Sequence, residues 1–195
     1  MKQKQDTRPL ETYISQVKAT LGKLPMEEIG RVIGVLNEAR MRGRRVYTFG
    51  NGGSAATASH FAGDLLKGAI CHGKPRIRAQ ALVDSMPAFS AWANDTAYDK
   101  VFAEQIESFT VAGDVVIGIS GSGNSPNVIK GMETARKKGA FTIGFVGFEG
   151  GKLKDVVDLP IIVPSESMEQ IEDIHLFLCH LITCCLRGDN NSQNR

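Results

Sequence analysis

The sequence predicts an α/β fold with a doubly wound, mostly parallel sheet of five strands, flanked by helices and preceded by a helical hairpin. Three observations support this prediction. Short apolar runs rich in β-branched residues alternate with helical patterns, several runs lack the polar alternation of a half-exposed strand, and two lead directly into a glycine- or serine-rich loop. The 195 residues are expected to form a single domain.

The amino-terminal region, about residues 11–43, is predicted to form the helical hairpin. Residues 11–24 and 25–42 both show helical spacing, and Gly43 is expected to end the second helix. The apolar stripe of the second helix consists of Met26, Ile29, Ile33 and Leu36.

Two units of strand, loop and helix follow the same design. The first has an aromatic and β-branched strand at residues 46–49, and the loop GNGGS at residues 50–54 leads from it into a helical pattern. The second has a buried strand at residues 114–119, the loop SGSGNS at residues 120–125 and a helix at residues 126–138. If both strands are parallel, both loops lie at the carboxyl edge of the sheet, where ligands of open α/β folds bind.

The remaining elements complete the alternation. Three further strands are expected at residues 78–83, 141–146 and 159–163. Further helices are expected around residues 86–93, 98–109 and 167–186. The polar tail at residues 188–195 (GDNNSQNR) is expected to be disordered.

Composition and charge exclude two classes of partner. The formal charge of +2 is the difference between 23 basic and 21 acidic side chains, which form no basic block, so we expect no nucleic-acid partner. Charges or glycines interrupt the apolar stretches before they reach the length of a bilayer, and the polar start resembles no signal peptide. We therefore expect a cytoplasmic protein without a membrane partner.

The four cysteines show no C-x-x-C spacing. Cys71 stands alone, whereas Cys179, Cys184 and Cys185 occur in an apolar helical pattern. Buried, reduced thiols are a better interpretation than a disulfide or a zinc knot.

The loop GNGGS can expose backbone N–H groups at the start of a helix, where the helix dipole favours anions. Ser54 can cap the helix and donate a hydrogen bond. A phosphate or a sugar hydroxyl would suit this loop, but an ordinary βα turn has the same composition, so the loop alone leaves both interpretations open. It matches neither G-x-G-x-x-G nor a P-loop lysine motif, which weakens a nucleotide hypothesis.

The loop SGSGNS combines three hydroxyl groups with small-residue backbone amides just before a helix. The hydroxyls belong to Ser120, Ser122 and Ser125. This combination suits a phosphate monoester, and the absence of lysine favours a sugar phosphate over a triphosphate. Together the two loops predict a phosphosugar site.

Several segments resemble a known family. They are GNGGS with HFA at residues 60–62 in the following helix, ISGSGNSPNVIKGMETARKKGA, and IEDIHLFLCH in the last helix. These segments are similar to the sugar isomerase (SIS) domain of phosphoheptose isomerases, over about residues 12–187. The resemblance implies one SIS domain with flavodoxin-like topology across residues 1–195, and the hairpin resembles the small single-domain branch rather than the two-domain aminosugar synthases.

Candidate acids, bases and metal ligands lie on two helices. His60 and Asp64 are four residues apart, so they share one helix face and could share a metal ion or a proton path, although a solvated helix face has the same spacing. The family places zinc ligands at these two positions and site members at Glu172 and His180. His175 matches an ordinary helix residue and His72 a surface residue.

The resemblance thus implies a zinc site made by His60, Asp64, Glu172 and His180. Eight residues of helix rise about 12 Å, so Glu172 and His180 of one chain hardly reach the same ion. The resemblance also implies a homotetramer with active sites at subunit boundaries, which would let side chains of different chains converge.

The implied reaction interconverts sedoheptulose 7-phosphate and D-glycero-D-manno-heptose 7-phosphate through an enediol, in the synthesis of heptose precursors for lipopolysaccharide. Asp64 and His180 are the expected catalytic pair, with the roles of base and acid open. The expected substrate-binding residues are Asn51, Gly52, Gly53, Ser54, Asp64, Asn94, Asp95, Ser120, Gly121, Ser122, Ser125 and Glu172. Asn94 and Asp95 are included because AND resembles the family's GND.

Three residues depart from the family pattern. Asp64 stands in place of glutamate, Glu172 in place of glutamine and Gly121 in place of threonine. The changes either compensate one another or mark a different substrate. Two alternatives therefore stay open: an isomerase of another phosphosugar, and a non-catalytic SIS protein that binds a phosphosugar or a protein partner, like the regulators of bacterial replication initiation. The ionisable set argues against the second.

Overall fold

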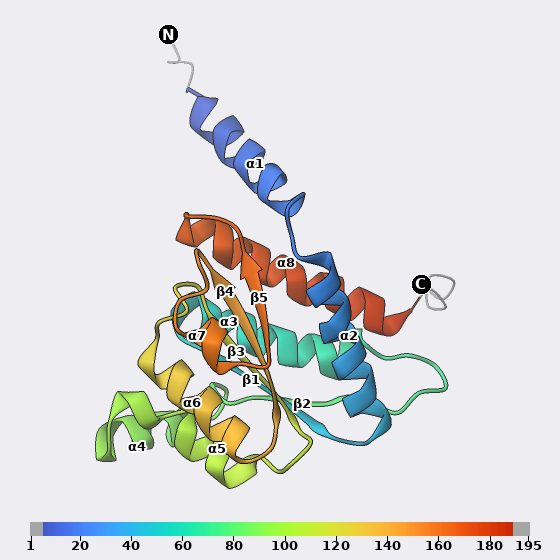
Figure 1. The fold of residues 1–195 in the computed structure, drawn as a ribbon, viewed down its shortest axis with the longest axis vertical. Helices are drawn as coiled ribbons and strands as arrows, with labels where there is room; N and C mark the ends of the chain where they lie inside the picture. The colour runs from blue at the N-terminus through green and yellow to red at the C-terminus, as the bar shows by residue number, and fades with distance from the viewer. Residues whose placement is uncertain (1–5, 189–195) are drawn as a thin grey trace.

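The structure, a computed structural model, describes residues 6–188. Its five-stranded sheet has the order β2-β1-β3-β4-β5, and every neighbouring pair is parallel (Figure 1). The strands are β1 (Arg45–Gly50), β2 (Arg78–Ala81), β3 (Val115–Ser120), β4 (Phe141–Gly147) and β5 (Leu159–Val163). The predicted five strands are confirmed, and the sheet is parallel throughout rather than mostly parallel.

The helices are α1 (Arg8–Leu21), α2 (Met26–Met41), α3 (Gly52–Gly63), α4 (Met86–Asp95), α5 (Ala103–Phe109), α6 (Pro126–Lys137), α7 (Leu153–Val156) and α8 (Met168–Arg187). A π-helical turn, η1 (Asp64–Gly68), continues α3, and a 3-10 turn, η2 (Tyr98–Lys100), precedes α5. The helix expected at residues 98–109 is therefore divided between η2 and α5. The sequence did not predict α7, because one turn is too short to show a period.

Helices cover both faces of the sheet, which confirms the doubly wound prediction. One apolar core joins the sheet to α2, α3 and α8, and the other joins it to α5, α6 and α7. Strand β1 supplies both cores, because Val46 points into the first while Tyr47 and Phe49 point into the second. Strands buried on both faces explain the absence of polar alternation in the sequence.

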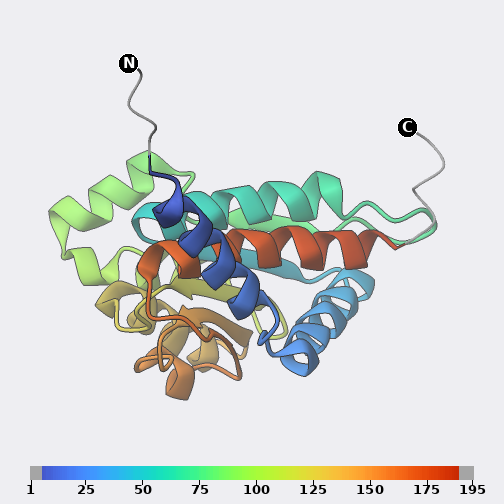
Figure 2. The ribbon, with the colours of Figure 1, turned by 90° about the horizontal axis from the view of Figure 1, so that it is seen from above.

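The predicted hairpin is wrong in its packing. The two helices exist, but α1 does not fold back along α2: Figure 1 shows α1 rising away from the sheet, and Figure 2 shows it crossing the start of α8. Two side-chain contacts join α1 to α8, from Tyr13 Oη to Asp173 Oδ2 (2.7 Å) and from Gln170 Nε2 to Gln16 Oε1 (2.7 Å). Ile29 and Leu36 of the expected apolar stripe of α2 pack into the core, Ile33 is partly buried against it, and Met26 is exposed.

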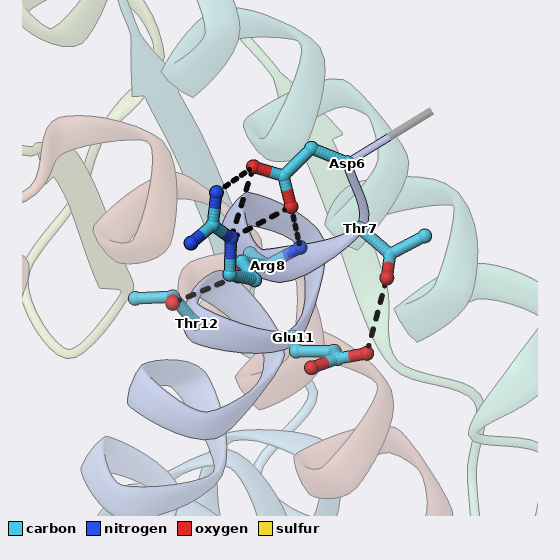
Figure 3. A network of polar contacts seen from close by, with 5 residues as sticks. All are labelled: Asp6, Thr7, Arg8, Glu11 and Thr12. Carbon is cyan, nitrogen blue, oxygen red and sulfur yellow. Dashed lines mark hydrogen bonds and ion pairs between the residues drawn. The ribbon is translucent and has the colours of Figure 1, made fainter. Parts of the chain in front are cut away.

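Local polar contacts fix the start of α1 (Figure 3). The Asp6 carboxylate accepts hydrogen bonds from the backbone N–H and the guanidinium of Arg8, which lower the pKa of Asp6. Thr7 Oγ1 donates to Glu11 Oε1 (3.3 Å), and Thr12 Oγ1 donates to the Arg8 carbonyl (2.8 Å). The helix consequently begins at Arg8, three residues before the predicted start.

A buried arginine joins α2 to α8 and to the end of η1. Arg40 is 1% exposed, and it donates hydrogen bonds to the carbonyls of Leu186 (3.0 Å) and Ala69 (2.6 Å). Both carbonyls lie where a helix or π-turn ends, and such ends favour a positive charge. Burial lowers the pKa of Arg40, and the two carbonyls offset part of that cost.

The cysteine prediction holds only in part. The thiols of Cys71, Cys179, Cys184 and Cys185 are free. Burial raises the pKa of Cys179, as expected of an inert core thiol, whereas Cys184 and Cys185 are exposed, because they fall on the outer side of α8.

Within residues 6–188, no helix combines the length and hydropathy that a bilayer crossing requires. The predicted tail lies outside the described residues, except for Gly188.

We expect Arg40→Ala to destabilise the fold by about 2–4 kcal/mol, because two buried carbonyls lose their donors. Arg42→Ala is the matched control: Arg42 is exposed and forms an ion pair with Glu38, a contact worth about 0.5 kcal/mol. Urea unfolding of both variants measures the difference. Equal unfolding free energies would contradict a structural role for Arg40.

Candidate functional site

The two predicted loops lie side by side at the carboxyl edge of the sheet. Strand β1 pairs with β3, and Gly50 is in register with Ile119, so the loops after these strands start at the same level. The loop after β1 leads into α3, and the loop after β3 leads into α6. The chain order reverses at this point, because β2 lies on the other side of β1. Open α/β sheets bind ligands at such a switch point.

Hydroxyl groups gather in the loop after β3, hereafter the serine loop (residues 120–125). Ser120 Oγ donates to Ser125 Oγ (3.2 Å), and Ser125 is the N-cap of α6 without a side-chain capping bond. Ser122 Oγ accepts from the backbone N–H of Asn124 (3.2 Å). The backbone N–H of Leu153 donates to the Gly123 carbonyl (2.9 Å), which anchors the loop to the segment after β4. These hydrogen bonds hold the hydroxyl groups of the serine loop in place at the amino end of α6.

A pair of amides connects the loop after β1, hereafter the glycine loop (residues 50–54), to the first turn of α6, which follows the serine loop directly. Asn51 Nδ2 donates to Asn127 Oδ1 (2.8 Å), and Asn127 Nδ2 donates back to Asn51 Oδ1 (2.9 Å). Tyr98 Oη also donates to Asn51 Oδ1 (2.9 Å). The sequence analysis missed Asn127 and Tyr98: an asparagine in the first turn of a helix is an ordinary feature, and nothing local indicates a partner across the sheet edge.

One face of α8 covers both loops. The Glu172 carboxylate lies over the glycine loop, where a Cβ added at Gly53 would be 2.5 Å from Oε2. One turn earlier, the Met168 sulfur occupies the space that a Cβ at Gly121 would need. Glycine at position 53 therefore makes room for a carboxylate at the amino end of α3, where the helix dipole favours negative charge.

Three ionisable side chains converge at the other end of α3, forming what we call the triad: His60, Asp64 and His180. The Nε2 atoms of the two histidines are 2.8 Å apart, and Asp64 Oδ2 lies 3.2 Å from His60 Nε2 and 3.7 Å from His180 Nε2. Two ring nitrogens at this distance cannot both carry a proton.

Backbone geometry produces this convergence. Asp64 is the first residue of the π-turn η1, a rare element that often occurs at functional sites. A Cβ at Gly68 would lie 2.8 Å from Thr183 Cγ2, so the glycine lets α8 approach η1 closely enough to bring His180 beside the other two.

The donor set of the triad fits a zinc ion. Asp64 Oδ2 is buried and lacks a hydrogen-bond partner among the residues described, although it points toward the two imidazoles. Ligand atoms of tetrahedral zinc lie about 3.3 Å apart, given metal–ligand distances of about 2.0–2.1 Å, and the three triad distances of 2.8, 3.2 and 3.7 Å bracket this value. Two imidazoles and one carboxylate also match the ligands of catalytic zinc.

Comparison with known proteins places these features in a family. Residues 12–147 match the model of the SIS domain. The phosphoheptose isomerase of Citrifermentans bemidjiense is 38% identical over 173 residues, 89% of each chain, and that of Aquifex aeolicus is 38% identical over 86% of this chain and 87% of its own. The chain belongs to the phosphoheptose isomerase family of SIS domain proteins.

The fold of this chain agrees with that of a solved relative. The phosphoheptose isomerase of Neisseria gonorrhoeae superposes with a TM-score of 0.85 at 28% identity, covering 92% of this chain and 97% of that one. This agreement supports the SIS fold and its five-stranded sheet.

The residues predicted for the family's site form two separate groups. Glu172 and the two loops form one, and the triad forms the other. Met168, whose sulfur lies against Gly121 of the serine loop, and His180 of the triad are twelve residues apart on α8, which corresponds to a rise of about 18 Å along that helix. Glu172 is not part of the triad of the same chain.

The remaining candidates lie elsewhere. Asn94 and Asp95 are exposed at the end of α4, where Asn94 Nδ2 donates to Asp95 Oδ1 (2.8 Å). His175 is buried against Phe145, and desolvation lowers its pKa to about 4, so it is a neutral core residue, as the sequence indicated. His72 is exposed in the segment between η1 and β2.

A cavity of about 400 Å³ lies beside the glycine loop. Its lining is Gly50, Asn51, Gly52, Ala55, Ala56, Val83, Met86, Phe89 and Tyr98. Most of these side chains are apolar, so the cavity supplies walls around the loop rather than a second set of polar ligands.

We expect purified protein to bind zinc stoichiometrically, with the triad as ligands. His60→Ala and His180→Ala should each weaken zinc binding about tenfold or more, because three protein ligands fall to two. His72→Ala, which removes an exposed histidine, is the control. Metal analysis after dialysis measures the content; retention of zinc by both triad variants would place the ion elsewhere.

Proposed function

We propose that the chain is an aldose–ketose isomerase that interconverts sedoheptulose 7-phosphate and D-glycero-D-manno-heptose 7-phosphate. The observation that carries this proposal is the triad, in which a carboxylate and two imidazoles converge in a member of the phosphoheptose isomerase family. A binding protein without catalysis would not need such a group, so a non-catalytic regulator fits less well. One SIS domain, residues 1–195, would carry the activity in the cytoplasm, in the synthesis of heptose precursors for lipopolysaccharide.

The reaction moves hydrogen between C1 and C2 through an enediol. One group must remove the proton bound to carbon, and another must donate a proton to the carbonyl oxygen. Asp64 and His180 fill these two roles, one as the base and the other as the acid. His60 completes the group, because its Nε2 lies within 3.2 Å of both side chains.

We propose that His60, Asp64 and His180 hold a zinc ion and that Glu172 belongs to the same site in the assembled protein. Bound zinc would supply Lewis-acid polarisation of the substrate carbonyl. The serine loop binds the phosphate through Ser120, Ser122, Ser125 and the backbone at Gly121. The glycine loop, through Gly52, Gly53 and Ser54, binds sugar hydroxyls. Phosphate binding far from the reacting carbons then aligns the substrate.

The separation of the two groups supports a homotetramer with shared active sites. A seven-carbon chain with a phosphate spans about 10 Å when extended, given C–C bonds of about 1.5 Å. This is shorter than the rise of about 18 Å along α8 from Met168, beside the serine loop, to His180 of the triad. We therefore propose that the triad of one subunit faces the loops and Glu172 of its neighbour. The exposed apolar residues Leu10 and Ile14 of α1 are suited to such packing.

A second candidate, isomerisation of another phosphosugar, is favoured by one observation. Met168 occupies the space beside Gly121, where the family pattern has a threonine, so the cradle for the phosphate lacks one hydroxyl and has a thioether wall. Asp64 has one methylene fewer than the family's glutamate, so its carboxylate lies closer to the backbone by about the length of one bond.

We expect purified protein to convert sedoheptulose 7-phosphate, and Asp64→Asn and His180→Ala to lower kcat about a hundredfold or more, because each removes one proton-transfer group. Asp155→Asn, at an exposed position of α7, is the control carboxylate. A coupled assay that detects the aldose measures turnover. An inactive wild-type tetramer with zinc bound would contradict the proposal, and turnover of only another ketose phosphate would favour the second candidate.

A complementation experiment tests whether sites are shared. Ser122→Asp puts a negative charge into the serine loop, and Asp64→Asn disables the triad, so each variant alone should be inactive. Mixed oligomers should regain about a quarter of wild-type activity, because half of the pairs are mixed and half of their sites combine two intact parts. Assay of co-expressed variants, with mixing verified by native mass spectrometry, measures the recovery. Mixed oligomers without activity would show that each chain carries a complete site.

A further inference from the structure

The amide pair between Asn51 and Asn127 joins the glycine loop to the first turn of α6, directly after the serine loop, and no other reciprocal amide pair occurs among the residues described. Asn127 is 1% exposed, and its amide meets that of Asn51 in two reciprocal hydrogen bonds of 2.8 and 2.9 Å. The two residues belong to different strand-to-helix connections, 76 positions apart in sequence. The pair therefore fixes the distance between the backbone of the glycine loop and the backbone at the start of α6.

The orientation of both amides is fixed by their other partners. Asn127 Oδ1 also accepts the backbone N–H of Val128 (2.9 Å), which only an oxygen can do. Asn51 Oδ1 also accepts the hydroxyl of Tyr98. Both lone pairs of the Asn51 oxygen and one of its two N–H groups are therefore occupied, and little of this side chain remains for a sugar hydroxyl.

The turn η2 also contacts both elements that the amide pair joins. Tyr98 of η2 bonds to Asn51 in the glycine loop, and the next residue, Asp99, forms an ion pair with Lys130 of α6. Neighbouring residues of one short turn thus contact the elements on both sides of the amide pair. The glycine loop and α6 are thus connected by two routes, the direct amide pair and the turn η2, and both of them end on the Asn51 side chain.

We propose that Asn127 is a positioning residue, which fixes the serine loop relative to the glycine loop so that both bind one phosphosugar at the same time. The proposal rests on the proposed function, in which the serine loop takes the phosphate and the glycine loop takes sugar hydroxyls. It changes the role of Asn51, which was expected to contact substrate, to that of the partner of Asn127. Misplacement of one binding element by about 1 Å can cost about a hundredfold in rate, so the separation of the loops matters to the reaction.

The test compares two ligands of the intact oligomer by calorimetry. Inorganic phosphate reports on the serine loop alone, and sedoheptulose 7-phosphate reports on both loops. Asn127→Ala should weaken sedoheptulose 7-phosphate about tenfold or more and leave phosphate affinity within about twofold. Asn51→Ala should do the same, and the double variant should be no worse than either single variant, because each substitution breaks the same pair.

Asn124→Ala is the contrasting variant, because the Asn124 amide bonds to the Ser122 carbonyl within the serine loop. It should weaken both ligands in parallel. Tyr98→Phe removes one hydrogen bond to Asn51 at an exposed position, so it tests the same connection with little risk to folding. It should weaken sedoheptulose 7-phosphate selectively, by less than Asn127→Ala.

Three results would overturn the inference. The first is parallel weakening of both ligands by Asn127→Ala, or by Tyr98→Phe if Asn127→Ala does not fold. The second is independent, multiplicative effects of Asn51→Ala and Asn127→Ala. The third is a wild-type protein that binds sedoheptulose 7-phosphate no more tightly than phosphate. Tight binding without turnover would instead contradict the proposed function and leave the role of Asn127 supported.

Discussion

The packing of α8 along α3 and η1 is the contact on which the site depends. Figure 2 shows the two helices side by side, and the close approach at Gly68 allows it. One face of α8 then places Met168 over the serine loop, Glu172 over the glycine loop and His180 beside Asp64. A shift of α8 by one residue would rotate all three side chains away together, since each residue turns a helix by about 100°.

Most of the fold could be predicted from local patterns. The strands β1, β3, β4 and β5 are short, largely apolar runs, and the two loops carry their glycines and serines in sequence, so the units 46–54 and 114–125 are recognisable without tertiary information. The packing of α1 was not predictable, because a helical pattern reports which face is apolar and not which neighbour takes it. The exposed Leu10 and Ile14 look in sequence like core residues.

The candidate site was predictable where one helix carries both partners. His60 and Asp64 share a face through their spacing, whereas the position of His180 beside them depends on the meeting of two helices far apart in sequence. The family resemblance supplied His180 and Glu172, and the rise of a helix predicted their separation within one chain. Asn127 was missed for the same reason, since its partner Asn51 is brought near only by the pairing of β1 with β3.

The parallel pairing of β1 with β3 has a consequence for folding. Parallel neighbours cannot be joined by a tight turn, and here β2, α4 and α5 all intervene before β3 returns to β1. The loop-closure entropy of this long excursion opposes the pairing until much of the chain is ordered. We therefore expect the two loops to reach their joint arrangement late in folding, and a ligand that binds both would act as a selective stabiliser of the finished fold.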